Sequence, residues 1–236
     1  MAGVDSNRGA KRAREARAAL GLGTDALPCA LTAVEGAGYN VVVAELPDNV
    51  AGACYRGDSG AVLWVNGAQP VTRQRFTLAH ELGHAWCRHD GTLEPDTVAT
   101  LSGKTSNPYE IQANAFAAEF LVPRAGFALG HEPTLEDVVE TATKYGVSAI
   151  VIVYRLRQLQ HTSPERIARL QQEVEDGLHS YLVHEPLRDR LADVEKLPYL
   201  SPALDGSLLA AALRNEAAVD ANVAQALERI TRPGRR

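Results

Sequence analysis

The strongest constraint on the fold is a change of hydrophobic pattern near residue 40. Residues 8–20 and 24–37 have the composition of helices, and the second stretch closes on the glycines of EGAGY. The chain then changes to short runs rich in β-branched or aromatic residues, separated by the turn clusters PDN and GDSG: NVVVAEL (40–46), GACYR (52–56) and AVLWV (61–65). Such runs indicate consecutive strands of a meander. We therefore predict a small three-stranded antiparallel sheet.

Helical sequence resumes after the third run. A helix is expected from Thr72, as its N-cap, to about Arg88. Asn107 with Pro108 marks the start of another, which ends before Pro123. The stretches TLEDVVETATKY and SAIVIVYRLRQLQ, joined at GV, predict a helical hairpin. The expected fold class is therefore α+β, with a helical core beside the sheet.

The composition changes again after Ser163 and Pro164. Long polar helical stretches then cover residues 164–184, 187–196 and 206–230, and TRPGRR has the character of a frayed tail. We predict two units, a domain at residues 1–161 and a mostly helical C-terminal extension at residues 162–236.

Composition and charge exclude several classes of protein. A net charge of −5 and a pI of about 5.8 argue against a chain that mainly neutralises phosphates or anionic lipid. The longest apolar run, residues 147–154, is too short to span a bilayer, and the N-terminus has no apolar signal core, so we expect a cytoplasmic protein. Cys29, Cys54 and Cys87 are odd in number and lack paired metal-type spacing, which favours reduced thiols.

The stretch RQRFTLAHELGHAWCRHD, residues 73–90, carries the chemistry. His80 and His84 are four residues apart, so on a helix they share one face and both imidazoles can reach one ion. Glu81 is offset by about 60° from His84 around that helix, close enough to accept a proton from water at the site. The alternative is an ordinary buried helix with hydrogen-bonded histidines, so the motif needs a third ligand.

Four residues are candidates for the third ligand. Asp90 has the offset of a metzincin ligand, but Cys87 stands where such sites need glycine. His89 is one position out of that register, and Cys87 itself lies two turns, roughly 10 Å, from His80. The remaining candidate is Glu110, in the first turn of the helix NPYEIQANAFAAEFLVP.

Glu110 has a second interpretation, because Asn107 and Glu110 have the spacing of a capping box. The small residues that share its face, at positions 113, 114 and 117, favour close approach of another helix and therefore the metal role. Glu119 lies half a turn away, and we expect it to be solvated. Either Asn114 or Asp96 could orient a ligand imidazole, and no oxyanion role is assigned to Tyr109 or His89.

RQRFTLAHELGH followed by EIQANAFAAEFLVP resembles the paired signature of the ImmA/IrrE family of zinc metallopeptidases, and VLWVN before the helix also fits. The resemblance covers roughly residues 10–160. It implies a gluzincin-like HExxH site in which His80, His84 and Glu110 bind Zn²⁺ and Glu81 is the catalytic base. It also implies a cytoplasmic endopeptidase, and hence a metalloprotease core within residues 1–161, that cleaves a helix-turn-helix transcriptional repressor and relieves repression. The composition, rich in Ala, Arg and Gly, separately indicates a bacterial source. FLVP stands where the family commonly has LLMP, a difference that affects packing alone.

Other functions stay open from the sequence. The alternative is a non-catalytic zinc-containing regulator that binds DNA or a protein partner, since residues 134–160 have a helix-turn-helix rhythm. The apolar start of its second helix, SAIVIV, argues against base contacts, so we expect no direct nucleic-acid binding. We also expect no membrane association, since the net charge is negative and no apolar run is long enough to span a bilayer. The run AVLWV is either a sheet edge that receives an extended substrate or a fully paired strand. The sequence does not determine the substrate, the cleavage site or the oligomeric state.

Overall fold

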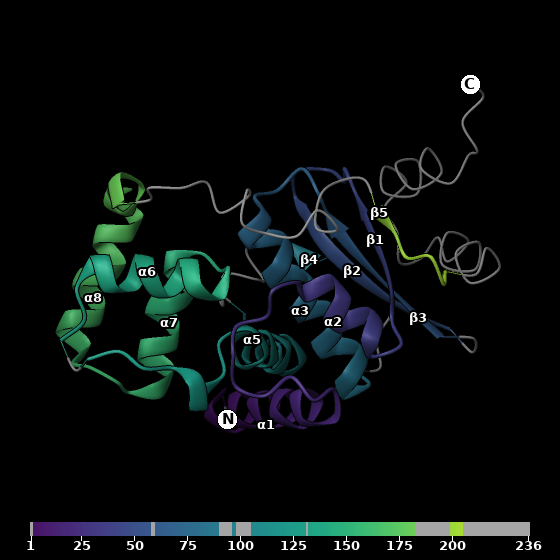
Figure 1. Cartoon of the computed structure of the whole chain (residues 1–236), viewed down its shortest axis with the longest axis horizontal. Helices are drawn as coiled ribbons and strands as arrows, with labels where there is room; N and C mark the ends of the chain where they lie inside the picture. The colour runs from purple at the N-terminus through teal and green to yellow at the C-terminus, as the bar shows by residue number, and fades with distance from the viewer. Residues whose placement is uncertain are drawn as a thin grey trace.

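The structure is a computed structural model that describes residues 2–57, 60–89, 96–97, 105–130, 132–182 and 199–204. Helices and a mixed sheet share this part of the chain, so the α+β class is confirmed (Figure 1). The helices are α1 (Ala2–Ala19), α2 (Ala30–Gly36), α3 (Val71–Cys87), α5 (Pro108–Leu121), α6 (Leu135–Tyr145), α7 (Ala149–Leu159) and α8 (Pro164–Glu175), with 3₁₀ turns at Arg124–Gly126 and Leu178–Leu182. The strands are β1 (Asn40–Ala44), β2 (Val50–Gly57), β3 (Gly60–Asn66), β4 (Asp96–Thr97) and β5 (Tyr199–Leu200).

The sheet differs from the predicted antiparallel meander. Its strand order is β4-β2-β3-β1-β5, with β2 antiparallel to β3 but β1 parallel to β3. The three-stranded antiparallel arrangement was therefore wrong, because β3 and not β2 lies in the middle. From Ala61 to Asn66 every residue of β3 is buried, which suits an interior strand. The prediction failed because apolar runs and turn clusters locate strands but do not specify which strands pair.

The connection from β1 to β2 is held by one buried side chain. Asn66 donates from Nδ2 to the carbonyl oxygens of Leu46 and Val50, and its Oδ1 accepts from the backbone N–H of Leu46. These bonds satisfy backbone groups that would otherwise be buried without partners, so the chain can cross from one side of β3 to the other. Because β3 is paired on both edges, the idea that it receives a substrate strand was also wrong.

The helices form successive layers below the sheet. Figure 1 shows α2 and α3 beside the strands, α5 on the side of α3 away from the sheet, and α1 below α5. Helix α3 begins at Val71, after Pro70, so Thr72 is not its cap. None of the helices within the described residues combines the length and the apolar character that crossing a bilayer requires.

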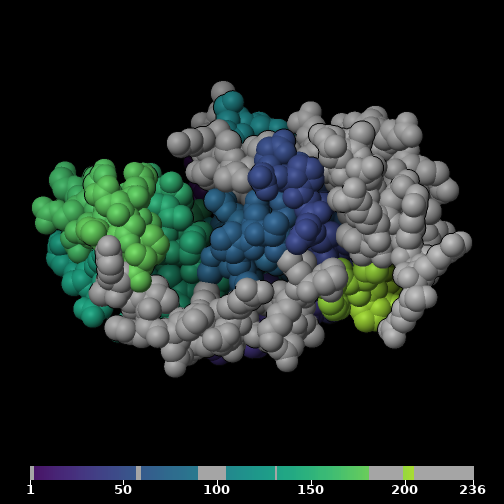
Figure 2. Space-filling model, turned by 90° about the horizontal axis from the view of Figure 1, so that it is seen from above, coloured from purple at the N-terminus to yellow at the C-terminus, as the bar shows by residue number. Residues whose placement is uncertain are grey.

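Helices α6, α7 and α8 lie together at the left of Figure 2, coloured teal to green, and β5, coloured yellow-green, lies toward the right. Ile167, Leu170 and Val174 of α8 join the hydrophobic core, and β5 pairs with β1 through Tyr199 and Leu200. The predicted helices at 187–196 and 206–230 lie outside the described residues. The division of the chain at residue 161 stays a prediction.

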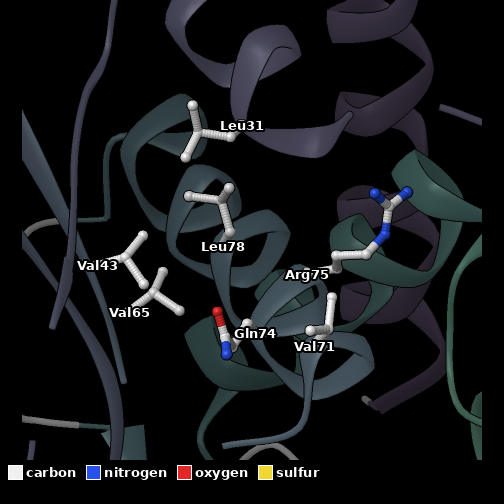
Figure 3. Close-up of a pocket in the computed structure, with 7 residues that line it drawn as sticks. All are labelled: Leu31, Val43, Val65, Val71, Gln74, Arg75 and Leu78. Carbon is white, nitrogen blue, oxygen red and sulfur yellow. The ribbon is translucent and has the colours of Figure 1, made fainter. Parts of the chain in front are cut away.

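A small apolar pocket lies between α2, α3 and the sheet (Figure 3). Its lining residues are Leu31, Val43, Val65, Val71, Gln74, Arg75 and Leu78. The cavity of about 20 Å³ has room for about one water molecule. His80 and His84 project from another side of α3 and do not line it, so this pocket is packing space and not a substrate site.

Candidate metal centre

Helix α3 presents both histidines of the HELGH stretch toward α5. The helix starts without a side-chain cap, but Gln74 Nε2 donates to the carbonyl oxygens of Gly67 and Gln69 and so secures its first turn. It ends at Cys87, and the C-cap residue Arg88 has left-handed backbone angles (φ 54°, ψ 47°). The backbone N–H of His89 then donates to the carbonyl oxygen of His84 at 3.1 Å, which is the Schellman ending of a helix.

Helix α5 brings Glu110 to the histidines. Asn107 Oδ1 accepts from the backbone N–H of Tyr109 at 3.0 Å, and Pro108 occupies the first turn, so the helix begins one residue before Tyr109. The two helices approach closely because Gly83 has no side chain: a Cβ there would lie 3.1 Å from Phe116 Cβ and 3.2 Å from Ala113 Cα.

The three predicted ligands meet at one point. His80 Nε2 lies 3.0 Å from His84 Nε2, and the two carboxylate oxygens of Glu110 lie 3.2 Å from His80 Nε2 and 3.5 Å from His84 Nε2. Ligand atoms bound tetrahedrally to one zinc ion at ~2.0–2.1 Å are ~3.3 Å apart. The triangle therefore has the dimensions of one face of a zinc coordination sphere. Glu110 faces the imidazoles and not the cap at Asn107.

The donor set also fits a cation chemically. Asn114 Oδ1 lies 3.1 Å from His80 Nδ1, and this oxygen only accepts, so His80 carries its proton on Nδ1 and turns an Nε2 lone pair toward Glu110. Of the two orienting residues considered, Asn114 thus contacts His80, whereas the side chain of Asp96 is not described. An ionised carboxylate facing nitrogen lone pairs is suited to a divalent cation.

Glu81 lies on the sheet side of the same helix. It is 1% exposed, and β2 passes directly beside it at Gly52. A Cβ on Gly52 would lie 2.8 Å from Glu81 Oε1 and 2.5 Å from Thr77 Cγ2, so only glycine allows the strand to run this close to the carboxylate. Sequence analysis missed this requirement, although a glycine within a strand signals a close approach.

The rejected ligand candidates occupy different positions. Cys87 is half-buried, and burial raises its pKa to about 11, which keeps it a thiol and not a thiolate ligand. Burial, followed by the neighbouring His84, lowers the pKa of His89 to about 4, so its ring is neutral at pH 7. Asp90 lies outside the described residues. Glu119, expected at the surface, is 2% exposed and paired with Arg155, so that expectation was wrong.

Two comparisons with known proteins identify the family. The family described as the IrrE N-terminal-like domain, a peptidase family, matches residues 37–157, just over half of the chain and a range that includes His80, Glu81, His84 and Glu110. The chain is also similar to the radiation response metalloprotease IrrE of Deinococcus radiodurans, with 36% identity over 101 residues, or 41% of this chain and 31% of that protein. The match thus spans less than a third of the relative's length. The chain belongs to the ImmA/IrrE family of metallopeptidases.

Proposed function

We propose that this protein is a zinc-dependent endopeptidase that hydrolyses a peptide bond in a protein substrate. The observation that carries the proposal is the triangle of His80, His84 and Glu110, with separations of 3.0 to 3.5 Å. Its two histidines lie on α3, the helix that also bears Glu81, and Glu110 lies on α5. Two imidazoles and one carboxylate leave a fourth position open, the pattern of catalytic and not of structural zinc sites. Zinc bound there supplies Lewis acidity toward the scissile carbonyl and makes hydroxide available near neutral pH.

Each residue has a separate task in this proposal. His80, His84 and Glu110 hold the ion, and Asn114 orients the ring of His80 through Nδ1. Glu81 acts as the general base that takes a proton from the attacking water and passes it to the leaving amine. Its burial against β2 fixes the carboxylate in one place, as proton transfer in a defined geometry requires.

For the substrate we extend the proposal to a DNA-binding transcriptional repressor of the helix-turn-helix class, whose cleavage relieves repression in the cytoplasm of a bacterial cell. This extension is supported by the resemblance of HELGH and EIQANAFAAEF to the family signature. The relative in Deinococcus radiodurans is named as a radiation response metalloprotease, which is compatible with a regulatory substrate.

The first test separates metal binding from chemistry. Zinc per chain is measured after brief dialysis against a mild chelator, in the wild type, Glu81→Gln and Glu110→Ala, with the exposed Glu140→Ala as the matched control. We expect near one zinc in the wild type, Glu81→Gln and the control, and a clear loss in Glu110→Ala. Zinc that is absent from the folded wild type would contradict the proposal.

The second test measures cleavage. The wild type and Glu81→Gln are incubated with the soluble proteins of a host cell, and new N-termini are identified by mass spectrometry. Glu81→Gln should lower the rate at which new N-termini appear by about 10²- to 10⁴-fold, because it removes the general base. Retained turnover in Glu81→Gln would refute the base. If no cleaved protein binds DNA, the repressor extension fails while the peptidase remains.

The non-catalytic DNA-binding regulator gains no support from the hairpin of α6 and α7. Ala149, Ile152 and Val153 at the start of α7 are buried, and Arg155 lies in the interior paired with Glu119. A recognition helix needs polar side chains free to reach base edges. Bound zinc without any cleavage would nevertheless favour a non-catalytic regulator that binds a protein partner.

A further inference from the structure

A chain of hydrogen bonds leads from the candidate metal ligand His84 to the N-terminal helix. His84 Nδ1 lies 3.1 Å from His89 Nδ1, and His89 Nε2 lies 3.3 Å from Gln112 Oε1. The amide nitrogen of Gln112 then donates to Asp5 Oδ1 at 3.0 Å. The chain therefore joins α3, α5 and α1, and it meets His84 on the nitrogen opposite the one that faces Glu110.

The carboxylate at the far end determines the direction of every bond. An ionised Asp5 accepts only, so Gln112 must turn its NH₂ group toward it and its oxygen toward His89. That oxygen also accepts only, so His89 carries its proton on Nε2 and presents an Nδ1 lone pair to His84. His84 must then carry its proton on Nδ1, which leaves the Nε2 lone pair turned toward Glu110 and His80.

We infer that Asp5, Gln112 and His89 are positioning residues that hold His84 in its metal-binding tautomer, so that helix α1 is part of the metal centre. The inference rests on the metal site of the proposed function and adds to it a set of supporting residues far away in the sequence. Partners of this kind, behind the ligands, fix ring orientation and raise the basicity of the binding nitrogen.

Two features of the backbone hold the chain of bonds in register. The left-handed turn at Arg88 folds the chain back, and His89 is then held between His84, at a ring-centroid distance of 5.0 Å, and Tyr109, at 4.7 Å. On the other side, α1 contacts α5 through Gly9, where a Cβ would lie only 2.0 Å from the carbonyl oxygen of Gln112. Gln112, which donates to Asp5, thus also lies where the backbones of the two helices approach closely.

The first experiment removes and then restores the hydrogen bonds that His89 makes to His84 and Gln112. The zinc dissociation constant is measured by competition with a chromogenic chelator in the wild type, His89→Phe and His89→Gln. His89→Phe keeps the ring contact with Tyr109 but loses both hydrogen bonds, and it should weaken zinc binding about 10- to 100-fold. His89→Gln can accept from His84 through its oxygen and donate to Gln112 through its nitrogen, so it should restore most of the affinity.

The second experiment reverses the donor–acceptor direction of the hydrogen bonds that lead from Asp5 to His84. Asp5→Lys replaces an acceptor by a donor, which turns Gln112 over and shifts the proton of each histidine, so that Nε2 of His84 becomes protonated. Zinc binding should weaken by a similar factor, and ¹⁵N NMR of the metal-free protein should show the tautomer of His84 change from Nδ1–H to Nε2–H. Glu15→Lys makes the same change of charge at an exposed position of α1 and should alter neither signal.

The helix contact gives a third variant with its own control. Gly9→Ala should push α1 away from α5 and weaken zinc binding, whereas Gly3→Ala, at a position of the same helix with open space around it, should not. Equal zinc affinity in the wild type, His89→Phe and Asp5→Lys would overturn the inference and leave the metal site intact. A loss confined to His89→Phe would overturn the role of α1, and a wild type that binds no zinc would overturn both the site and the inference.

Discussion

Helix α5 carries two glutamates that are removed from solvent and have opposite kinds of partner. Glu110, in its first turn, faces the imidazoles of His80 and His84, while Glu119, nine residues later on the other side of the helix, faces the guanidinium groups of Arg155 and Arg14. Glu119 is 2% exposed, and the side chain of Glu110 is 14% exposed. Residue type and burial therefore do not distinguish the two.

The surroundings of Glu119 and Glu110 differ in the group that supplies the positive charge. Arg155 is permanently charged, so its positive charge balances the negative charge of Glu119 within the protein. The hydrogen bonds of His80 and His84 favour tautomers whose Nε2 lone pairs face Glu110, so the positive charge there is supplied by a bound cation. A buried carboxylate opposite an arginine indicates structure, whereas one opposite two oriented imidazoles indicates a metal site.

The largest expected effect on folding comes from Glu119→Ala. It leaves Arg155, which is 1% exposed, as an uncompensated buried charge and should lower the free energy of unfolding by about 3–5 kcal/mol. Urea unfolding of the metal-free protein measures this. The double variant Glu119→Leu with Arg155→Met should recover much of the loss, because it removes both charges. If Glu119→Ala instead abolished zinc binding in the folded protein, the two glutamates would not have separate roles.

Glu110→Ala should affect zinc affinity more than the stability of the metal-free protein, the reverse of Glu119→Ala. Because loss of a partner behind a ligand already costs about 10- to 100-fold in metal affinity, loss of the ligand itself should cost more than about 100-fold. Zinc at about 100 times its dissociation constant should raise the free energy of unfolding of the wild type by about 2.7 kcal/mol, and this increment should vanish in Glu110→Ala but persist in Glu119→Ala. Thermal or urea unfolding with and without zinc measures the increment in both variants. An undiminished increment in Glu110→Ala would remove Glu110 from the site.

Gly83→Ala tests whether the helix spacing matters at the Glu110 end of α5. The added methyl group would lie 3.1–3.2 Å from Phe116 and Ala113, so α5 must shift by a few tenths of an ångström. We expect a loss of about 1 kcal/mol or more in stability, the lower end of overpacking, and weaker zinc binding because Glu110 moves with the helix. The control Gly36→Ala has open space around it and should be neutral or slightly stabilising. Unchanged zinc affinity in Gly83→Ala would show that Glu110 tolerates the displacement.

The sequence predicted what depends on local spacing. The i, i+4 spacing of His80 and His84 and the small stripe beside Glu110 both follow from the geometry of one helix, and the structure places all three side chains together. Strands β1, β2 and β3 were also located to within a few residues, because apolar runs and turn clusters are local signals. The two-residue strands β4 and β5 were not predicted.

Pairing between distant segments could not be read in this way. The position of β3 in the middle of the sheet depends on the crossing held by Asn66, and the burial of Glu119 depends on Arg155, 36 residues later. The link between Asp5 and Gln112 spans 107 positions. One signal was present: Arg155 stands within an otherwise apolar stripe of α7, and a buried charge of that kind calls for a partner.

The smallest effect is expected from the second partner of Glu119. The side chain of Arg14 is 54% exposed and its Nη1 lies 3.6 Å from Glu119 Oε1, so water screens the interaction and holding the long side chain costs entropy. Arg14→Gln should therefore lower the free energy of unfolding by less than about 1 kcal/mol in urea unfolding, and the exposed Arg169→Gln serves as the control for loss of one positive charge. A loss as large as that of Glu119→Ala would show that Glu119 depends on two cations, Arg14 of α1 and Arg155 of α7. Arg155 alone would then not balance the charge of Glu119, and the stated difference between Glu119 and Glu110 would be wrong.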